Sequence, residues 1–209
     1  MGIKERRERE RVEIREKILD AARELFATQG YEAVTMRKIA EGIEYSPTAI
    51  YFHFKDKETV LRALCEADFL ALAGEFREIA KIADPVERLR ATGLAYADFG
   101  LSHPNHYRLM FMTPHPYSKE EEMELHKGNP EEDAYAFLKG IVTEAIADGR
   151  LRPELDDPEL VAQTMWAGMH GVISLQCAKA EDPWVEWRDF AARTRVMLDV
   201  LIRGMVRES

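Results

Sequence analysis

The twelve residues 46–57 constrain this chain most, because they encode a short helix that cannot form a core element by itself. Ser46 is a good N-cap residue, since its hydroxyl can accept a hydrogen bond from a backbone N–H of the first turn. Pro47 falls at the first helical position, where its missing N–H is not needed. Ile50 and Phe54 lie four residues apart and can anchor one face. The other side chains, which carry hydroxyl, phenol and imidazole groups, are left to point away from the core.

A second short helix precedes this one, between residues 35 and 43. Thr35 can cap it, and Arg37 and Lys38 then face outward. Its apolar residues recur at i, i+3, i+4 and i+7, which predicts a buried stripe of Met36, Ile39, Ala40 and Ile43. Glu44 and Tyr45 supply the turn between the two helices. This spacing is typical of a helix-turn-helix, whose second helix lies in a DNA groove lined with phosphates and base edges.

Residues 35–57, with the helix before them, resemble the DNA-binding domain of the tetracycline-repressor (TetR) family of bacterial transcriptional regulators. The run from Ala49 to Lys57, AIYFHFKDK, is the most specific part of the resemblance. The resemblance implies that Tyr51 and Lys57 hold phosphates and that the start of the second helix reads bases. Family members usually carry Gly and a small aliphatic residue in the turn, where this chain has Glu44 and Tyr45. The turn is nevertheless expected to be kept.

We expect the base contacts to come from residues 46–48 and the phosphate contacts from both helices. The full set of predicted DNA-binding residues is Thr35, Arg37, Lys38, Ser46, Pro47, Thr48, Tyr51, Phe52, His53, Lys55 and Lys57. Two assignments stay open. The Phe52 ring either contacts DNA or packs against the first helix, and His53 can serve bases or phosphates.

The charge of the chain is unevenly distributed. The formal net charge is −9, but residues 1–57 carry 12 Lys and Arg against 11 Asp and Glu, a net charge of +1, and residues 58–209 carry the rest, a net charge of −10. An acidic body with a near-neutral head is weakly consistent with DNA binding. The alternating charges of residues 3–11 indicate either a solvated helix extension or an arm that follows DNA phosphates.

The whole chain is expected to be all-α, because no stretch alternates as a strand does. We expect a helix-turn-helix domain over residues 1–57 and a helical effector-binding and dimerisation domain over residues 58–209. A long fourth helix should join them and end near residue 83. The densely charged N-terminus is unlike a signal peptide, and Cys65 and Cys177 have no metal-ligand spacing, so we expect a cytoplasmic protein.

A group of large apolar side chains near proline-induced helix breaks predicts either a packed core or a pocket for a small-molecule effector. The spacing of Trp166, His170 and Gly171 also resembles a TetR subset named for its Trp-His-Gly pattern. The candidate effector-binding residues are Tyr96, His106, Tyr107, Met110, Phe111, Trp166 and His170. His170 can equally be a hydrogen-bonded core residue. The effector should be largely apolar or aromatic, and no cofactor is expected.

A metal site is not favoured, although His103, His106, His115 and His126 invite one, because no carboxylate or Cys completes a ligand set. No Gly-rich phosphate loop, nucleophile elbow or paired metal-ligand motif indicates an enzyme. Apolar helices expected at 159–179 and 184–206 could pair with those of a second copy in a four-helix bundle. The predicted interface residues are Gly168, Gly171, Leu175, Phe190, Thr194, Leu198 and Leu201.

The sequence therefore predicts a homodimeric transcriptional repressor that a small molecule releases from a palindromic operator. The alternatives are a helical interaction protein that binds no DNA and a constitutive DNA-binding protein without a ligand switch.

Overall fold

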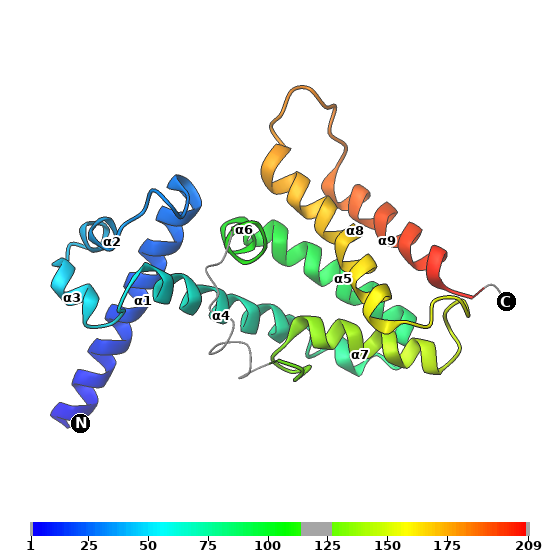
Figure 1. The fold of residues 1–209 in the computed structure, drawn as a ribbon, viewed down its shortest axis with the longest axis horizontal. Coiled ribbons are helices and arrows are strands. Elements are labelled where there is room, and N and C mark those ends of the chain that lie inside the picture. The colour runs from blue at the N-terminus through cyan, green and yellow to red at the C-terminus, as the bar shows by residue number, and fades with distance from the viewer. Residues whose placement is uncertain (1, 114–126, 208–209) are drawn as a thin grey trace. The chain divides into compact units, whose positions relative to one another are not determined.

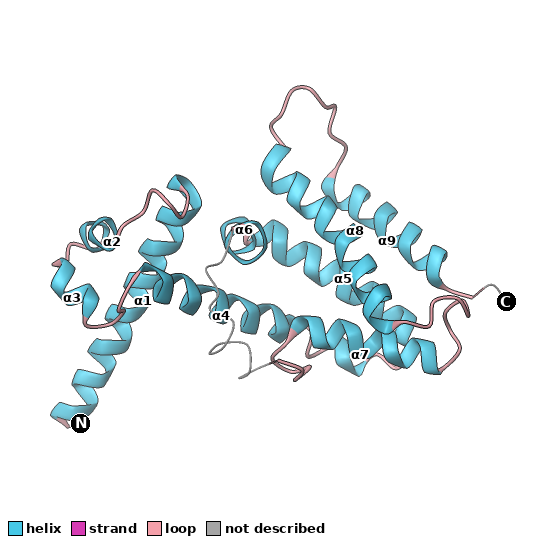
Figure 2. Ribbon diagram, viewed as in Figure 1, coloured by secondary structure: helices cyan, strands magenta, loops and turns pink. Residues whose placement is uncertain are grey.

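Helices account for all the regular secondary structure of the computed structural model, which describes residues 2–113 and 127–207 (Figure 2). Within these ranges there is no strand, and Leu151 and Val206 form an isolated antiparallel bridge. The all-α prediction is confirmed. None of the helices in these ranges combines the length and apolar character that a bilayer crossing requires.

The helices follow one another along the chain as labelled in Figure 1. They are α1 (Ile3–Gln29), α2 (Met36–Gly42), α3 (Pro47–Tyr51), α4 (Lys57–Glu75), the 3₁₀ turn η1 (Ile79–Lys81), α5 (Pro85–Ser102), α6 (Pro104–Met112), α7 (Ala134–Ala147), α8 (Pro158–Lys179) and α9 (Phe190–Met205).

The described chain divides into two compact units. The N-terminal unit contains residues 2–68 and 105–113, and the C-terminal unit contains residues 69–104 and 127–207. The helix α4 contributes to both units, and α6 belongs to the N-terminal unit apart from its first residue. These bounds describe how the residues pack, and not which unit performs which function. The functional division at residues 57 and 58 stays a prediction.

The core of the N-terminal unit is built from one face of each helix. On α1, Ile18 and Ala22 are fully buried, and they share a face because they lie four residues apart. On α2, Ile39 and Ala40 are fully buried, as the predicted stripe requires. Ile50 of α3 is also fully buried, so a helix of five residues is held by a single anchor together with the following Phe54.

An ionic network joins three helices within the N-terminal unit. Asp68 of α4 is buried, with 2% of its surface exposed. Its Oδ2 accepts a hydrogen bond from Nη1 of Arg23 on α1, and its Oδ1 lies 2.9 Å from Nδ1 of His106 on α6. The thiol of Cys65, one helical turn earlier, lies 4.0 Å from the carbonyl oxygen of Leu109 on α6. The helix α6 is therefore attached to α4 by polar as well as apolar contacts.

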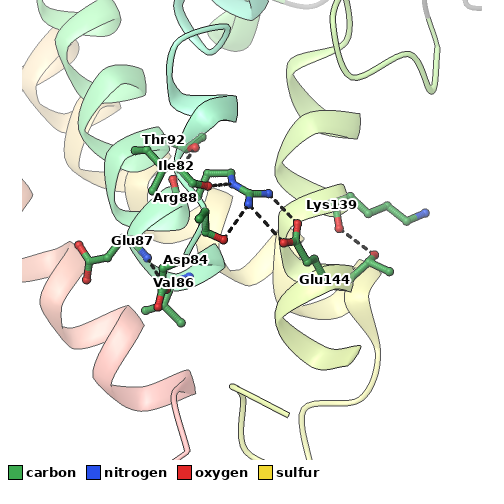
Figure 3. A network of polar contacts seen from close by, with 10 residues as sticks. Ile82, Asp84, Val86, Glu87, Arg88, Thr92, Lys139 and Glu144 are labelled. Atoms are coloured by element: carbon green, nitrogen blue, oxygen red, sulfur yellow. Dashed lines mark hydrogen bonds and ion pairs between the residues drawn. The ribbon is translucent and has the colours of Figure 1, made fainter. Parts of the chain in front are cut away.

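Arg88 ties the start of α5 to α7 in the C-terminal unit (Figure 3). Its guanidinium binds both carboxylate oxygens of Glu144, at 2.6 and 3.2 Å, and its Nε donates to the carbonyl oxygen of Ile82 at 2.7 Å. Such a two-pronged pair holds the guanidinium plane in one orientation. Asp84 caps α5 by accepting from the backbone N–H groups of Val86 and Glu87.

The helix α9 packs on α5 and α8 where glycines leave room for leucines. A Cβ atom on Gly93 would lie 2.6 Å from Cδ1 of Leu198, and one on Gly168 would lie 2.8 Å from Cδ1 of Leu201. Both distances are too short for a real contact, so a larger residue at either position would force the facing leucine side chain to move. The predicted close helix crossing at Gly168 is thus made within one chain.

Two helix boundaries differ from the sequence predictions. The helix α4 ends at Glu75 rather than near residue 83, and hydrogen bonds from Phe76 and Arg77 to residues three positions earlier tighten its end. The helix α9 begins at Phe190, not near residue 184. Asp189 is its N-cap, whereas Asp182 accepts from the backbone N–H of Trp184 in a local turn.

Candidate nucleic-acid interface

The two helices of the helix-turn-helix begin at the caps that the sequence predicts. The Thr35 hydroxyl accepts a hydrogen bond of 3.2 Å from the backbone N–H of Lys38. The Ser46 hydroxyl accepts one of 3.3 Å from the backbone N–H of Ala49. Each cap satisfies one backbone donor of a first turn and leaves the remaining N–H groups of that turn near the surface. Both threonine and serine are exposed.

The turn between the helices keeps its form through a strained residue. Glu44 has φ of +60°, in the left-handed region that glycine enters readily and other residues rarely adopt. The backbone N–H of Tyr45 reaches back to the carbonyl oxygen of Ala40 at 2.9 Å, which closes the end of α2. Glu44 therefore adopts a left-handed conformation that glycine would adopt more readily, at the expense of backbone strain.

The outer face of α3 is exposed and partly aromatic. Tyr51 is 54% exposed and Phe52 is 81% exposed. Phe52 therefore does not pack against α1, and its contact with DNA stays a prediction. Thr48 and Pro47 are also exposed, next to Ser46 at the start of the helix. The side chains expected at the bases and those expected at phosphates are thus accessible together.

Three of the predicted DNA-binding cations already have partners in the N-terminal unit. Arg37 Nε lies 2.9 Å from a carboxylate oxygen of Glu41. Lys38 Nζ donates to Gln29 and to the carbonyl oxygen of Ala33, and so connects the end of α1 to α2. Lys57 Nζ donates to a backbone carbonyl oxygen 26 residues earlier in the chain, at 2.8 Å. These contacts position the guanidinium group of Arg37 and the ammonium groups of the two lysines. Lys55 is exposed.

His53 follows α3 and is only partly exposed. Burial lowers the pKa of its imidazole, and the positive charges of Arg11 and Arg15 on α1 lower the pKa further. The Arg15 guanidinium also lies over the neighbouring Phe54 ring, 4.7 Å from its centroid. The lowered pKa favours the neutral imidazole of His53. A neutral imidazole suits a hydrogen bond to a base edge better than an ion pair with a phosphate.

The candidate effector-binding residues fall into two groups, each within its own unit. In the C-terminal unit, Trp166 of α8 donates from Nε1 to the Tyr96 hydroxyl at 3.0 Å. The Trp166 ring lies 6.0 Å from the Tyr135 ring and 6.4 Å from the His170 ring. Burial lowers the pKa of His170, which favours its neutral imidazole. Tyr135 is not among the residues predicted from the sequence, because nothing near it in the chain marks it.

A polar group lies beside this aromatic cluster. Glu159 accepts hydrogen bonds from Tyr135 at 2.5 Å and from Gln163 at 3.2 Å, and it pairs with Lys139 at 2.6 Å. The hydrogen bond from Lys139, followed by that from Tyr135, lowers the pKa of Glu159 to about 2. This carboxylate holds the Tyr135 hydroxyl and with it the edge of the aromatic cluster.

The second group of candidate effector-binding residues lies on α6 in the N-terminal unit. Tyr107 and Met110 are buried, and the Tyr107 ring lies 4.8 Å from the Phe111 ring. His106 is among the candidate effector-binding residues, but its Nδ1 already bonds Asp68. Sequence analysis missed the roles of Asp68 and Arg23, which lie 45 residues apart.

Several predicted interface residues are covered within the single chain. Thr194 and Leu198 are 3% and 1% exposed, so neither is available to a second copy. Their assignment to a seam between chains is wrong, because the face of α9 that carries them packs on its own α5. Leu201 packs on Gly168, and Phe190 is partly buried. Leu175 and Gly171 remain accessible, the former 48% exposed.

A different face of α8 and α9 is apolar and exposed. Leu160 and Leu175 of α8 are 58% and 48% exposed, and Val196 and Val200 of α9 are 64% and 62% exposed. The two valines lie one turn apart, as do Ala192 before them and Gly204 after them. This apolar face, which we call the α8–α9 face, consists of Leu160, Gly171, Leu175, Val196 and Val200.

The described residues hold no group of three or more His, Cys, Asp or Glu side chains that could bind a metal ion. His115 and His126, which entered the metal hypothesis, lie outside the described residues. Burial, and then the charge of Asp68, raise the pKa of the Cys65 thiol to about 12. Cys65 is therefore a packed, protonated thiol.

Residues 18–64 match the family model described as bacterial regulatory proteins, tetR family. Residues 89–201 match that of the tetracyclin repressor-like C-terminal domain, so the two models together span most of the chain. The chain belongs to the TetR family. Its members are DNA-binding transcriptional regulators, which agrees with the exposed α3 and its caps. Membership of the Trp-His-Gly subset stays a prediction.

Relatives and solved structures of the TetR family resemble the chain over different lengths. The HTH-type transcriptional repressor KstR2 of Mycolicibacterium smegmatis is 30% identical over 146 residues, which are 68% of this chain and 69% of that protein. AcnR repressors of Corynebacterium species are 42% identical over 59 to 62 residues, about a third of their own length. The structure of the ketosteroid transcriptional regulator KstR2 of Mycobacterium tuberculosis is 22% identical, covers 93% of this chain and 95% of its own, and superposes with a TM-score of 0.66. A complex of SmeT with triclosan is 21% identical, covers 93% and 92%, and has a TM-score of 0.69. At these identities the solved structures show a shared fold.

Proposed function

We propose that this TetR-family regulator is a repressor that binds a two-fold symmetric operator as a homodimer and leaves it when a small, largely apolar molecule binds. The observation that carries the proposal is the exposed outer face of α3. It presents Thr48, Tyr51 and Phe52 beside two capped helix starts, while Ile50 anchors the helix from behind. This arrangement suits insertion into a major groove.

Base reading is assigned to the start of α3. The exposed Ser46, Pro47 and Thr48 precede the first full turn, where side chains of a recognition helix reach base edges. Tyr51, Lys57 and the Thr35 backbone region are assigned to phosphates. His53, whose lowered pKa favours the neutral imidazole, is assigned to a base edge or to the sugar next to it.

Dimerisation is assigned to the α8–α9 face rather than to the residues around Leu198. Exposed Val196 and Val200 on α9 and Leu175 on α8 form an apolar surface of the kind that two copies cover around a two-fold axis. A single head binds one half-site, so a dimer is needed for useful affinity. The operator should then contain two half-sites separated by about one helical turn or a multiple of it.

The effector is assigned to the aromatic group around Trp166. Trp166, Tyr96 and Tyr135 combine large apolar surfaces with hydroxyl and indole groups, which is the usual composition of a small-molecule site. The effector must bind the DNA-incompetent state more tightly, and a coupling of about 1–3 kcal/mol would weaken operator binding roughly 5- to 150-fold. We assign the α6 residues Tyr107, Met110 and Phe111 to the same switch. As a DNA-binding regulator, the protein is proposed to act in the cytoplasm and to catalyse no reaction.

Selection of bound sequences from a random DNA pool tests the proposal directly. The full-length protein should enrich a two-fold symmetric sequence, and fluorescence anisotropy on that sequence should give a measurable affinity. Thr48→Ala should change the preferred base at one position in each half-site. Thr143→Ala is the matched control, because Thr143 is an exposed threonine of α7 in the other unit. Failure of the wild type to enrich any sequence would overturn the proposal.

The ligand switch needs its own measurement. A screen of small hydrophobic compounds should identify one that raises the melting temperature and releases the operator. Trp166→Ala should weaken that release while operator affinity without the compound stays unchanged. Trp184→Ala controls for loss of an indole, because Trp184 is 92% exposed in the segment between α8 and α9. If no compound in a broad screen changes operator affinity, the protein is a constitutive DNA-binding protein.

A further inference from the structure

The first part of α1 extends beyond the packed core of the N-terminal unit. The helix starts at Ile3, but its first fully buried residue is Ile18, and every side chain from residue 4 to residue 13 is exposed. At about 1.5 Å per residue, these ten residues add about 15 Å of helix. The extension precedes residues 18–64, which the family model matches. Burial of its side chains does not explain why it is helical and charged.

The charges of this extension are sorted by face. Lys4, Arg7, Arg11 and Arg15 follow one another at intervals of three, four and four residues, so they lie on one side of the helix. Ile18 lies three residues after Arg15, on the same side of the helix, and its side chain faces the core. Glu8 borders this basic side. The other acidic residues of the extension, Glu5, Glu10, Glu13 and Glu16, fall on the remaining sides.

The basic side begins next to the end of the recognition helix. The Arg15 guanidinium lies 4.7 Å from the centroid of the Phe54 ring. Arg11 and Arg15 are both close enough to His53 to act on its charge. From this point the cations continue along α1 toward its N-terminus, in line with the side of the helix that faces the helix-turn-helix core.

The arginines of this side differ from their neighbours in their partners. Arg6, on another side, pairs with Glu10 at 3.4 Å. Among the described residues, Arg7 and Arg11 have no ion pair or hydrogen bond, so both guanidinium groups are available to an anion. Two arginines spaced by one helical turn and followed by a third suit a regular row of negative charges better than a single anion.

We propose that Lys4, Arg7, Arg11 and Arg15 form a second DNA-binding surface that contacts backbone phosphates flanking the half-site read by α3. The proposal rests on the proposed DNA binding. Contacts of this kind carry no base specificity, but they add affinity that depends strongly on salt. The footprint of each head on DNA is therefore longer than α3 alone would produce, and the acidic protein as a whole gains a local basic surface.

Two double variants with the same change in net charge test the proposal. Arg7→Gln with Arg11→Gln removes two cations from the basic side, and Arg6→Gln with Arg9→Gln removes two from other sides of the same turns. Operator affinity of the full-length protein is measured between 50 and 200 mM salt. The first variant should lower the slope of log affinity against log salt by about 0.9 for each lost contact, or about 3.6 for two heads. The control variant should keep a slope close to that of the wild type.

Trimming the DNA supplies a second readout. Removing the base pairs outside the two half-sites should weaken the wild type and the control variant by a larger factor than the Arg7→Gln, Arg11→Gln variant, which keeps only Lys4 and Arg15 on the basic side. Equal helical circular dichroism of the three proteins excludes a loss of fold. Equal slopes and equal responses to trimming in both variants would overturn the proposal. A wild type that selects no DNA sequence would instead overturn the proposed function.

Discussion

The Lys57 ammonium group lies 2.8 Å from the carbonyl oxygen of Tyr31 and 4.0 Å from the centroid of the Tyr31 ring. One cation therefore holds the backbone and the ring of a single residue, in the segment that connects α1 to α2. These contacts already restrict the Lys57 side chain, so contact with a phosphate costs little further conformational entropy. Lys57 thus combines a structural contact with its proposed phosphate contact.

Replacing Lys57 by Ala should have two separable effects. Loss of the hydrogen bond and the cation–π contact should lower the free energy of unfolding by about 1–2 kcal/mol, as urea unfolding can measure. Loss of the phosphate contact should weaken binding to every DNA sequence and reduce the salt slope by about 0.9 per head. Lys127→Ala is a control for the loss of one positive charge, because Lys127 is exposed in the C-terminal unit and is not among the predicted DNA-binding residues. A stable Lys57→Ala protein with an unchanged slope would remove Lys57 from the interface.

Glu44→Gly should stabilise the protein. The left-handed backbone of Glu44 costs about 1–2 kcal/mol in a residue with a Cβ, while glycine adds about 0.4–1 kcal/mol of unfolded-state entropy. The net expectation is a gain of about 0.5 kcal/mol in the free energy of unfolding, together with unchanged operator affinity. Glu41→Gly, inside α2, should instead be destabilising. A loss of stability for Glu44→Gly would show that the glutamate side chain supports the turn.

A glutamate introduced on the buried face of α9 should affect folding, whereas one introduced on its exposed face should affect dimerisation. Leu198→Glu places a carboxylate in the core against Gly93 and should reduce stability by more than about 4 kcal/mol, so the protein loses its cooperative thermal transition. Val200→Glu, on the exposed side, should leave the fold intact and yield monomers in sedimentation experiments. Val12→Glu is the matched control, an exposed valine on α1. Dimers that survive Val200→Glu would remove the α8–α9 face from the interface.

The imidazole of His53 should titrate below its ordinary range. Burial is the largest cause of the lowered pKa, and the charges of Arg11 and Arg15 are smaller causes. Arg11→Gln should therefore raise the pKa of His53 only part of the way toward about 6.5. NMR titration measures this directly, and Arg9→Gln should leave the pKa unchanged. Between the lowered pKa and about 6.5 the unfolded chain binds more protons, so the free energy of unfolding must fall as pH decreases through this window. An identical response in both variants would mean that Arg11 does not act on His53.

The features predicted well from the sequence are those determined by neighbours in the chain. The caps Thr35 and Ser46 and the anchor Ile50 depend on spacings of three or four residues, which helical geometry makes local. The predicted start of α9 was wrong because a local capping signal occurs twice in this segment. Asp182 and Asp189 carry the same capping signal, and only tertiary packing decides that Asp182 forms a turn while Asp189 caps a helix.

The features that the sequence could not give depend on partners far along the chain. Helical periodicity identifies the apolar sides of α9, but it does not say which side meets α5 of the same chain. Leu198 was therefore assigned to the wrong partner, because its contact Gly93 lies on another helix. The polarity of Asp68 is unremarkable in the sequence, and its burial became visible only with α1, α4 and α6 in place.

The carboxylate of Asp68 restricts how α6 can move against α4. With one oxygen bonded to Arg23 and the other to His106, a displacement of α6 along α4 cannot proceed by small steps that keep both bonds. The helix either remains docked or breaks the His106 bond and finds a new register. We therefore expect the contact between Asp68 and His106 to oppose small movements of α6 inside the unit that carries α3.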